Sequence, residues 1–97
     1  MKQKGGLSRG YLWTLTIEDI WKLYEDQGGV CALSGVPIKW ADKGLTATVS
    51  IDRIDSSEGY VLENVQLVHK DVNFMKQQFD QEYFINMCKA IAENFTQ

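Results

Sequence analysis

The first clear pattern of apolar positions runs from Ile17 to Tyr24, where apolar residues recur every three or four positions. Thr16 stands just before this run and is a favoured N-cap, and the acids that follow it suit the positive end of a helix. The pair Gly28-Gly29 favours the end of the helix at that point. The pattern predicts a helix over residues 17–27, followed by a small turn or hairpin within residues 30–40.

The period changes to two over residues 47–51, where apolar and polar residues alternate. This alternation predicts a half-buried strand with Asp52 at its end, on the polar face. The strand is followed by turn-forming residues at 56–59 and by a second extended segment at residues 60–68, which is interrupted near Glu63. The two segments therefore predict a β-hairpin.

Two stripes of side chains come next at helical spacing. The apolar stripe consists of Val68, Val72, Met75 and Phe79, and the polar stripe beside it of His69, Asn73 and Lys76. We expect the apolar stripe to pack on the hairpin and the polar stripe to lie at its edge, toward the strand ends. Asp80 then caps a last helix over residues 80–95.

Length and composition indicate one small domain that spans residues 1–97. With 44% hydrophobic residues the chain can form a core and is not a disordered tail. No apolar run approaches the roughly 20 residues of a membrane helix, and residues 1–6 lack the apolar stretch of a secretory signal. We expect a cytoplasmic protein that does not bind membranes. Its two cysteines, Cys31 and Cys88, are expected to be small core residues.

Charge changes this picture only locally. Ten basic against 13 acidic residues give a net charge of −3, which does not favour nucleic-acid binding through bulk charge. Residues 1–15 are different, because they contain Lys2, Lys4 and Arg9 and no acid. Such a basic N-terminal arm suits contacts to phosphate, and it equally suits a solubilising terminus.

Three side chains with oxygen and nitrogen donors are expected to meet where the hairpin joins the next helix. Asp52 ends the first strand, and His69 and Asn73 are four residues apart on the predicted helix. One carboxylate, one imidazole and one amide oxygen would form an open site for a divalent ion. Structural roles compete with this hypothesis, since Asp52 would also serve as a turn cap and His69 as a surface or core histidine.

Five short motifs in this region strongly resemble those of the HNH nucleases, which are also called ββα-metal or His-Me finger nucleases. The motifs are Cys31-Ala32-Leu33-Ser34-Gly35, Ser50-Ile51-Asp52-Arg53-Ile54-Asp55, Gly59-Tyr60, Glu63-Asn64-Val65-Gln66-Leu67-Val68-His69 and Asn73-Phe74-Met75-Lys76. The similarity covers residues 27–78 and is greatest to small phage-type members related to homing endonucleases and endonuclease VII-like enzymes. It implies an α+β fold with a ββα-metal core at residues 46–79, flanked by helices, in a phage-encoded or bacterial cytoplasmic protein.

The resemblance also implies roles for individual residues. Asp52 matches the strand-end acid that binds the catalytic Mg²⁺ or Mn²⁺, and Asn73 matches the ligand on the helix. Asn64 matches the central Asn of the family name, which ties the loop backbone and supports the site. The residues expected to contact DNA are Lys76, Lys70, Arg53 and Arg9.

Two departures from the family pattern affect the chemistry. Where relatives hold a structural zinc, this chain reads Cys31, Ser34, His69 and Val72, so no structural zinc is expected. Where relatives have a histidine base, this chain has Arg53, whose guanidinium stays protonated and cannot accept a proton. Arg53 would instead bind the scissile phosphate, and the base would be His69 or hydroxide on the metal. For His69 itself the role of metal ligand is favoured, and the role of base, or neither role, is the alternative.

Three functions follow from these expectations. The first is a metal-dependent DNA endonuclease that hydrolyses phosphodiester bonds, in which case a homodimer would be needed to cut both strands together. The second is a catalytically degenerate HNH-fold module that binds DNA without cutting it. The third is a structural domain that binds a partner protein.

Overall fold

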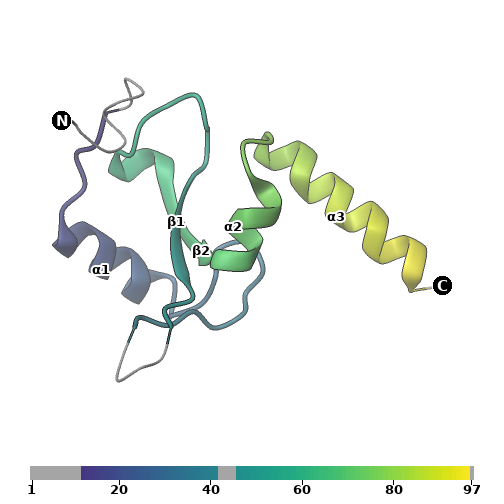
Figure 1. The fold of residues 1–97 in the computed structure, drawn as a ribbon, viewed down its shortest axis with the longest axis horizontal. Helices are drawn as coiled ribbons and strands as arrows, with labels where there is room; N and C mark the ends of the chain where they lie inside the picture. Colours follow the sequence, from purple (N-terminus) through teal and green to yellow (C-terminus); the bar gives the residue numbers. More distant parts are fainter. Residues whose placement is uncertain (1–11, 42–45, 97) are drawn as a thin grey trace.

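The computed structural model describes residues 12–41 and 46–96. Within these ranges the chain has an α+β fold with three α-helices and one antiparallel two-stranded sheet (Figure 1). The elements are α1 (Ile17–Asp26), β1 (Val49–Arg53), a 3₁₀ turn (Leu62–Asn64), β2 (Val65–His69), α2 (Lys70–Lys76) and α3 (Gln81–Phe95). The α+β class expected from the sequence is thereby confirmed.

Helix α1 begins at a complete capping box. The hydroxyl of Thr16 accepts a hydrogen bond from the Asp19 N–H at 3.1 Å, and the Asp19 carboxylate accepts one from the Thr16 N–H at 3.1 Å. These two bonds satisfy backbone donors that a helix N-terminus leaves free. At the other end Gly28 has a φ of +72°, which glycine adopts without steric cost. The predicted helix is confirmed to within one residue.

Strands β1 and β2 form the predicted hairpin, and the interruption expected near residue 63 is the 3₁₀ turn. In the register Val49 lies opposite His69, and Asp52 lies opposite Gln66. Paired residues share a face of the sheet, and successive residues alternate between faces. Asp52 and Gln66 therefore lie on one face, while His69 lies on the other.

Helices α1 and α2 lie on opposite sides of the strands, whereas α3 extends away from them (Figure 1). The largest cluster of buried apolar residues consists of Cys31, Ile38, Leu67 and Val68. Part of α1 and Val72 of α2 pack against this cluster. The core therefore joins the hairpin to the segment at residues 30–40, where an isolated bridge pairs Val30 with Pro37 as the expected small turn.

The outer edge of β2 is covered by a side chain rather than by a third strand. The Gln27 amide donates to the Leu67 carbonyl at 2.9 Å, and its oxygen accepts from the Leu67 N–H at 3.0 Å. The same amide nitrogen donates to the Val30 carbonyl at 2.8 Å. Gln27 thus makes with Leu67 the two bonds that a neighbouring strand residue would make.

Helix α2 begins later than the sequence pattern predicted. Val68 and His69 are strand residues that pair with Ser50 and Val49, so the prediction that they lie on the helix is wrong. His69 is instead the N-cap of α2, and its Nδ1 accepts from the Asp71 N–H at 3.1 Å. Pairing with β1 satisfies the backbone of these two residues and overrides their helical spacing.

Helix α3 begins at the expected cap, because the Asp80 carboxylate accepts from the Tyr83 N–H at 3.2 Å. No residue of α3 is buried. Cys88 on this helix is exposed, so its prediction as a core residue is wrong, whereas Cys31 is buried as expected. Among the described residues, no helix combines the length and apolar character needed to cross a membrane.

Candidate functional site

The hairpin and α2 enclose a small polar pocket of about 160 Å³. Its lining residues are Ile51, Asp52, Arg53, Ser56, Tyr60, Asn73 and Gln77. The pocket lining thus includes the predicted strand-end acid, the predicted helical amide and Arg53. Asp52 and Arg53 come from the end of β1, and Asn73 comes from the middle of α2.

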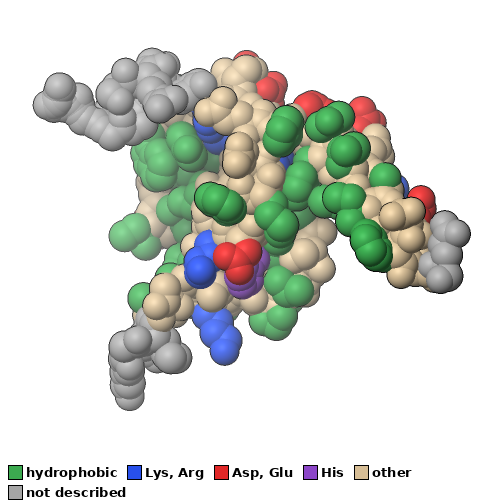
Figure 2. All heavy atoms as spheres, turned by 45° about the vertical axis from the view of Figure 1, so that its right-hand side comes forward, with side chains coloured by type: hydrophobic (Ala, Val, Ile, Leu, Met, Phe, Trp, Pro, Cys, Tyr) green, Lys and Arg blue, Asp and Glu red, His purple; other side chains and the backbone are tan. Residues whose placement is uncertain are grey.

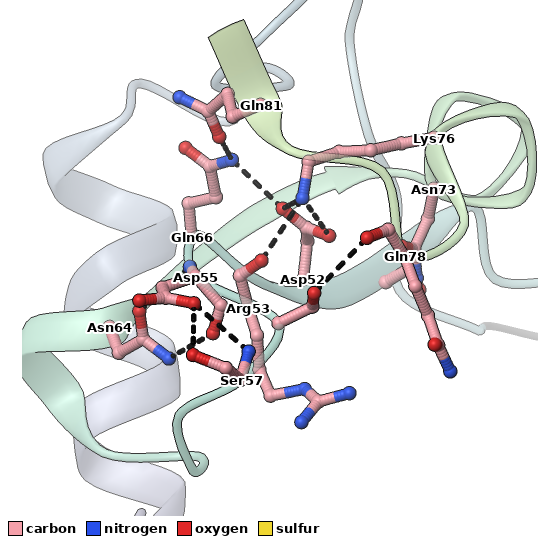
Figure 3. A network of polar contacts seen from close by, with 12 residues as sticks. Asp52, Arg53, Asp55, Ser57, Asn64, Gln66, Asn73, Lys76, Gln78 and Gln81 are labelled. Atoms are coloured by element: carbon pink, nitrogen blue, oxygen red, sulfur yellow. Dashed lines mark hydrogen bonds and ion pairs between the residues drawn. The ribbon is translucent and has the colours of Figure 1, made fainter. Parts of the chain in front are cut away.

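The sequence pattern placed Asp52 on the polar face of its strand. In the structure this side chain is almost completely buried beside Lys76 (Figure 3). The Lys76 ammonium donates to both carboxylate oxygens at 3.1 Å and to the Arg53 carbonyl at 3.0 Å. An ammonium has three protons, and all three find acceptors here. The expectation that Lys76 faces phosphate is therefore wrong, because α2 ends directly over Asp52 and turns its last residue inward.

Two glutamines that sequence reasoning missed complete the surroundings of Asp52. Gln66 donates to the Asp52 carboxylate at 3.0 Å and to the Gln81 side-chain oxygen at 2.7 Å. Gln66 lies directly opposite Asp52 in the hairpin, so the register would have identified it. Gln81 is the first residue of α3. This chain of contacts links the acid to the start of α3.

Asn73 is held against the hairpin by one short hydrogen bond. Its amide nitrogen donates to the Ser50 hydroxyl at 2.6 Å. Ser50 and Asp52 are two residues apart on β1, so both side chains lie on the face that α2 covers. Asp52 and Asn73 therefore line the same pocket, although each is bonded to a different partner.

Asn64 ties the loop between the strands, as the resemblance implied. Its amide nitrogen donates to the carbonyls of Asp55 at 3.0 Å and Gly59 at 2.9 Å, and its oxygen accepts from the Asp55 N–H at 2.9 Å. Asp55 itself acts as a turn acid, since one carboxylate oxygen accepts from the Ser57 hydroxyl at 2.6 Å and the Ser57 N–H at 2.9 Å. These bonds, first the hydroxyl and then the backbone N–H, lower the pKa of Asp55 below its usual value.

The loop also rests on the segment before α1. The Tyr60 N–H donates to the Leu12 carbonyl at 2.7 Å. A Cβ atom at Gly59 would lie only 2.6 Å from that carbonyl oxygen, so glycine is required for the close approach. This contact explains the Gly59-Tyr60 motif and fixes Tyr60 beside the pocket.

Arg53 points away from the buried ion pair (Figure 3). Its guanidinium donates to the Glu58 carbonyl at 3.1 Å and lies 5.0 Å from the centre of the Tyr60 ring. Stacking of this kind orients the planar guanidinium while its charge stays near solvent. Arg53 therefore places a positive charge on the wall of the pocket.

His69 does not meet Asp52 and Asn73, which corrects the predicted three-residue site. It lies on the other face of the hairpin, three residues along β2 from the partner of Asp52. That separation is about 10 Å along a strand. The Nδ1 of His69 caps α2 and lies 3.7 Å from the Asp71 carboxylate. The geometry therefore supports neither ligand nor base roles for His69 in the pocket.

Lys70 and Arg9 are the other residues predicted to contact DNA. Lys70 is exposed and its ammonium lies 3.6 Å from the Asp71 carboxylate, so it is paired only at the surface. Arg9 and the rest of the arm up to residue 11 lie outside the described residues. Lys70 is the first residue of α2 and does not line the pocket, whose nearest lining residue on this helix is Asn73.

Of the four positions that the resemblance compares with a zinc site, Cys31 is buried in the core cluster, Ser34 is exposed and His69 caps α2. The Cys31 sulfur accepts from the Ser34 N–H at 3.3 Å, and Val72 packs on the same cluster. Burial raises the pKa of Cys31, but hydrogen bonds from the Ser34 side chain and from the backbone of His69 and nearby residues bring it below its ordinary value. Among the described residues, no three His, Cys, Asp or Glu side chains lie close enough to hold a metal.

The donors in the pocket suit a hydrated magnesium or manganese ion better than an enclosed one. Asp52 and Asn73 offer carboxylate and amide oxygens, which are the ligands that hard divalent ions prefer. Magnesium commonly takes one or two protein ligands and completes its shell with water and phosphate. The residues therefore fit such an ion, provided that it shares the Asp52 carboxylate with Lys76.

Comparisons with protein-family models, with curated proteins and with solved structures find no match for this chain. The chemistry of the pocket itself is therefore the basis for assigning a function.

Proposed function

We propose that this protein is a metal-dependent DNA endonuclease of the HNH type, with a ββα-metal core formed by β1, β2 and α2. The observation that carries the proposal is one pocket whose lining includes an aspartate, an asparagine and an arginine, namely Asp52, Asn73 and Arg53. Asp52 and Asn73 supply oxygen donors for a cation, and Arg53 supplies a fixed positive charge for the phosphate. These are the groups that phosphodiester hydrolysis requires.

Arg53 binds and orients the scissile phosphate in this proposal. Its planar guanidinium can make two parallel hydrogen bonds to phosphate oxygens, and these strengthen as negative charge develops in the transition state. Asp52 and Asn73 would hold the divalent ion, which when bound would supply further positive charge and lower the pKa of water. Asn64 has an indirect role, because its hydrogen bonds hold the loop that follows Arg53.

The pocket lining contains no imidazole, so water or hydroxide from solvent is left to take the proton of the attacking water. Arg53 cannot do so because its guanidinium remains protonated. We therefore expect cleavage to become faster as the pH rises through the neutral range, without a plateau set by a histidine.

A plasmid-nicking assay with Mg²⁺ or Mn²⁺ tests this proposal. We expect the wild-type chain to convert supercoiled plasmid to the nicked form, Arg53→Ala to lose at least about 100-fold in rate, and Arg53→Lys to retain part of it. Arg53→His would restore a base and give a pH profile with a plateau. Lys22→Ala is the control, since this lysine is exposed on α1, forms a surface ion pair with Asp26 and does not line the pocket.

A second candidate, a catalytically degenerate module that binds DNA, is favoured by the ion pair itself. Lys76 already provides a positive charge to Asp52, in a position that a catalytic cation would need to share. A salt-dependent gel shift with no nicking under any divalent metal would favour this candidate over the endonuclease. Nicking by Arg53→His but not by the wild type would favour it further.

A further inference from the structure

The exposed side of α3 carries a continuous ridge of large apolar side chains. Figure 2 shows hydrophobic side chains along this helix and over the neighbouring α2. The ridge consists of Tyr83, Met87, Ile91 and Phe95 of α3, which follow one another at intervals of four residues, and of Phe79 just before the helix, whose ring centre lies 5.6 Å from that of Tyr83; all five are 46–82% exposed. Residues four apart are neighbours on a helix surface, so these side chains form one uninterrupted row.

An apolar groove of about 390 Å³ lies beside the ridge, between α3 and α2. Its α3 side includes Phe84, Cys88 and Ala92, again four residues apart, and its α2 side includes Val72 and Met75. Two of the three α3 residues in the row are small. One face of a single chain therefore carries the ridge of large side chains directly beside a groove that has room for such a ridge.

The charges of α3 argue against a nucleic acid or a membrane as the occupant. At 100° per residue, Glu82 and Glu93 lie on the side of the helix away from the ridge, and Lys89 is the one basic residue among those that line the groove. A phosphate backbone requires clustered basic residues, and a helix that lies on an anionic membrane is rich in Lys and Arg. This face has neither, so its chemistry fits another apolar protein surface.

The size of the face matches what a stable dimer needs. At roughly 200 Å² for a large apolar residue, the exposed parts of Met75 and the five ridge residues together amount to about 700 Å². The groove lining adds to this area. A standard interface buries about 800 Å² on each partner, whereas monomeric proteins rarely expose apolar patches this large.

We propose that two copies of this chain associate through α3, with the ridge of each copy in the groove of the other. A two-fold interface requires one surface that is complementary to itself, and the adjacent ridge and groove meet that requirement. Rows of residues spaced four apart pack with helix axes crossing at about −50°. The inference does not depend on the proposed endonuclease function, because the pocket is formed by other residues.

Sedimentation velocity or light scattering on the full chain tests the proposal. We expect a discrete dimer at tens of micromolar and a dissociation constant that Ile91→Glu raises by at least about 30-fold, the change that corresponds to an interface hot spot. Each copy would carry the substitution, so both halves of the interface are affected. Asn86→Glu is the matched control, since it adds the same charge to the opposite side of α3 and should leave the dimer intact.

Circular dichroism separates loss of association from loss of folding. Because Ile91 is exposed and α3 has no buried residue, Ile91→Glu should keep the helix content of the wild type. A wild-type chain that stays monomeric at about 100 μM would overturn the proposal. So would an Ile91→Glu variant that dimerises like the wild type, or a monomer that sediments with anionic vesicles.

Discussion

Replacing Lys76 with methionine should strongly destabilise the fold, because it removes one member of a buried ion pair. The side chain of Lys76 is fully buried, and its ammonium contacts both oxygens of Asp52 at 3.1 Å. Methionine fills a similar volume without a charge. The Asp52 carboxylate would then stay in the interior with only the Gln66 amide as a hydrogen-bond donor among the contacts described above.

The expected cost is about 3–5 kcal/mol in the free energy of unfolding, which is typical when one partner of a buried pair is removed. A domain of this size has a total stability of about 5–15 kcal/mol. At about 4–8 °C for each kcal/mol, the melting temperature should fall by roughly 12 °C or more. Asp52→Ala should be comparably costly, because it leaves the buried Lys76 ammonium without its carboxylate partner.

Urea unfolding followed by circular dichroism measures this cost, with Lys70→Met as the control. Lys70 is on the same helix but exposed, so its replacement should change stability by less than about 0.5 kcal/mol. The double variant Asp52→Leu/Lys76→Met should be more stable than the two single costs together predict, since no charge is left unpaired. A Lys76→Met variant that loses less than about 1 kcal/mol would refute the burial argument.

The loop between the strands gives two further predictions. Asn64→Ala removes three hydrogen bonds to the backbone of Asp55 and Gly59. It should lower the free energy of unfolding by about 2–4 kcal/mol in the same urea assay, and a loss of less than about 1 kcal/mol would contradict the role of Asn64 in holding the loop. Ser57→Ala removes the hydroxyl that lowers the pKa of Asp55, so a carboxyl NMR titration should show that pKa rising toward its ordinary value. A carboxyl group whose pKa is lowered in the folded state stabilises the fold at pH values above its ordinary pKa, and this stabilisation is lost as the pH falls through the lowered pKa. The Ser57→Ala variant has less of this stabilisation and should therefore lose less stability in acid. An unchanged titration would count against this assignment.

Local signals in the sequence were sufficient for most of the fold. Thr16 with Asp19 determines where α1 begins, and the alternation before Asp52 determines β1. Asp80, as the N-cap, likewise determines where α3 begins. Each of these features depends on residues within a few positions of one another, so neighbouring side chains alone indicate the outcome.

The errors concern residues whose environment is set by distant partners. Lys76 is a typical surface residue by type, and only the short length of α2 brings it over Asp52, 24 positions earlier in the chain. His69 fits a helical stripe, but pairing with Val49 keeps it in β2. Cys88 fits an apolar face, yet α3 packs too loosely to bury it. Periodicity describes which residues share a face, and not which face another element covers.

The bonds between Gln27 and Leu67 have a consequence for how the protein behaves at high concentration. A two-stranded sheet exposes edges that can recruit strands from other molecules and begin aggregation. The Gln27 amide occupies the backbone groups of Leu67 on that edge, and Ala32 donates a further bond to the Leu67 carbonyl at 2.9 Å. A polar side chain far from the pocket thereby protects the sheet. Its loss would appear first as insolubility rather than as a defect in binding.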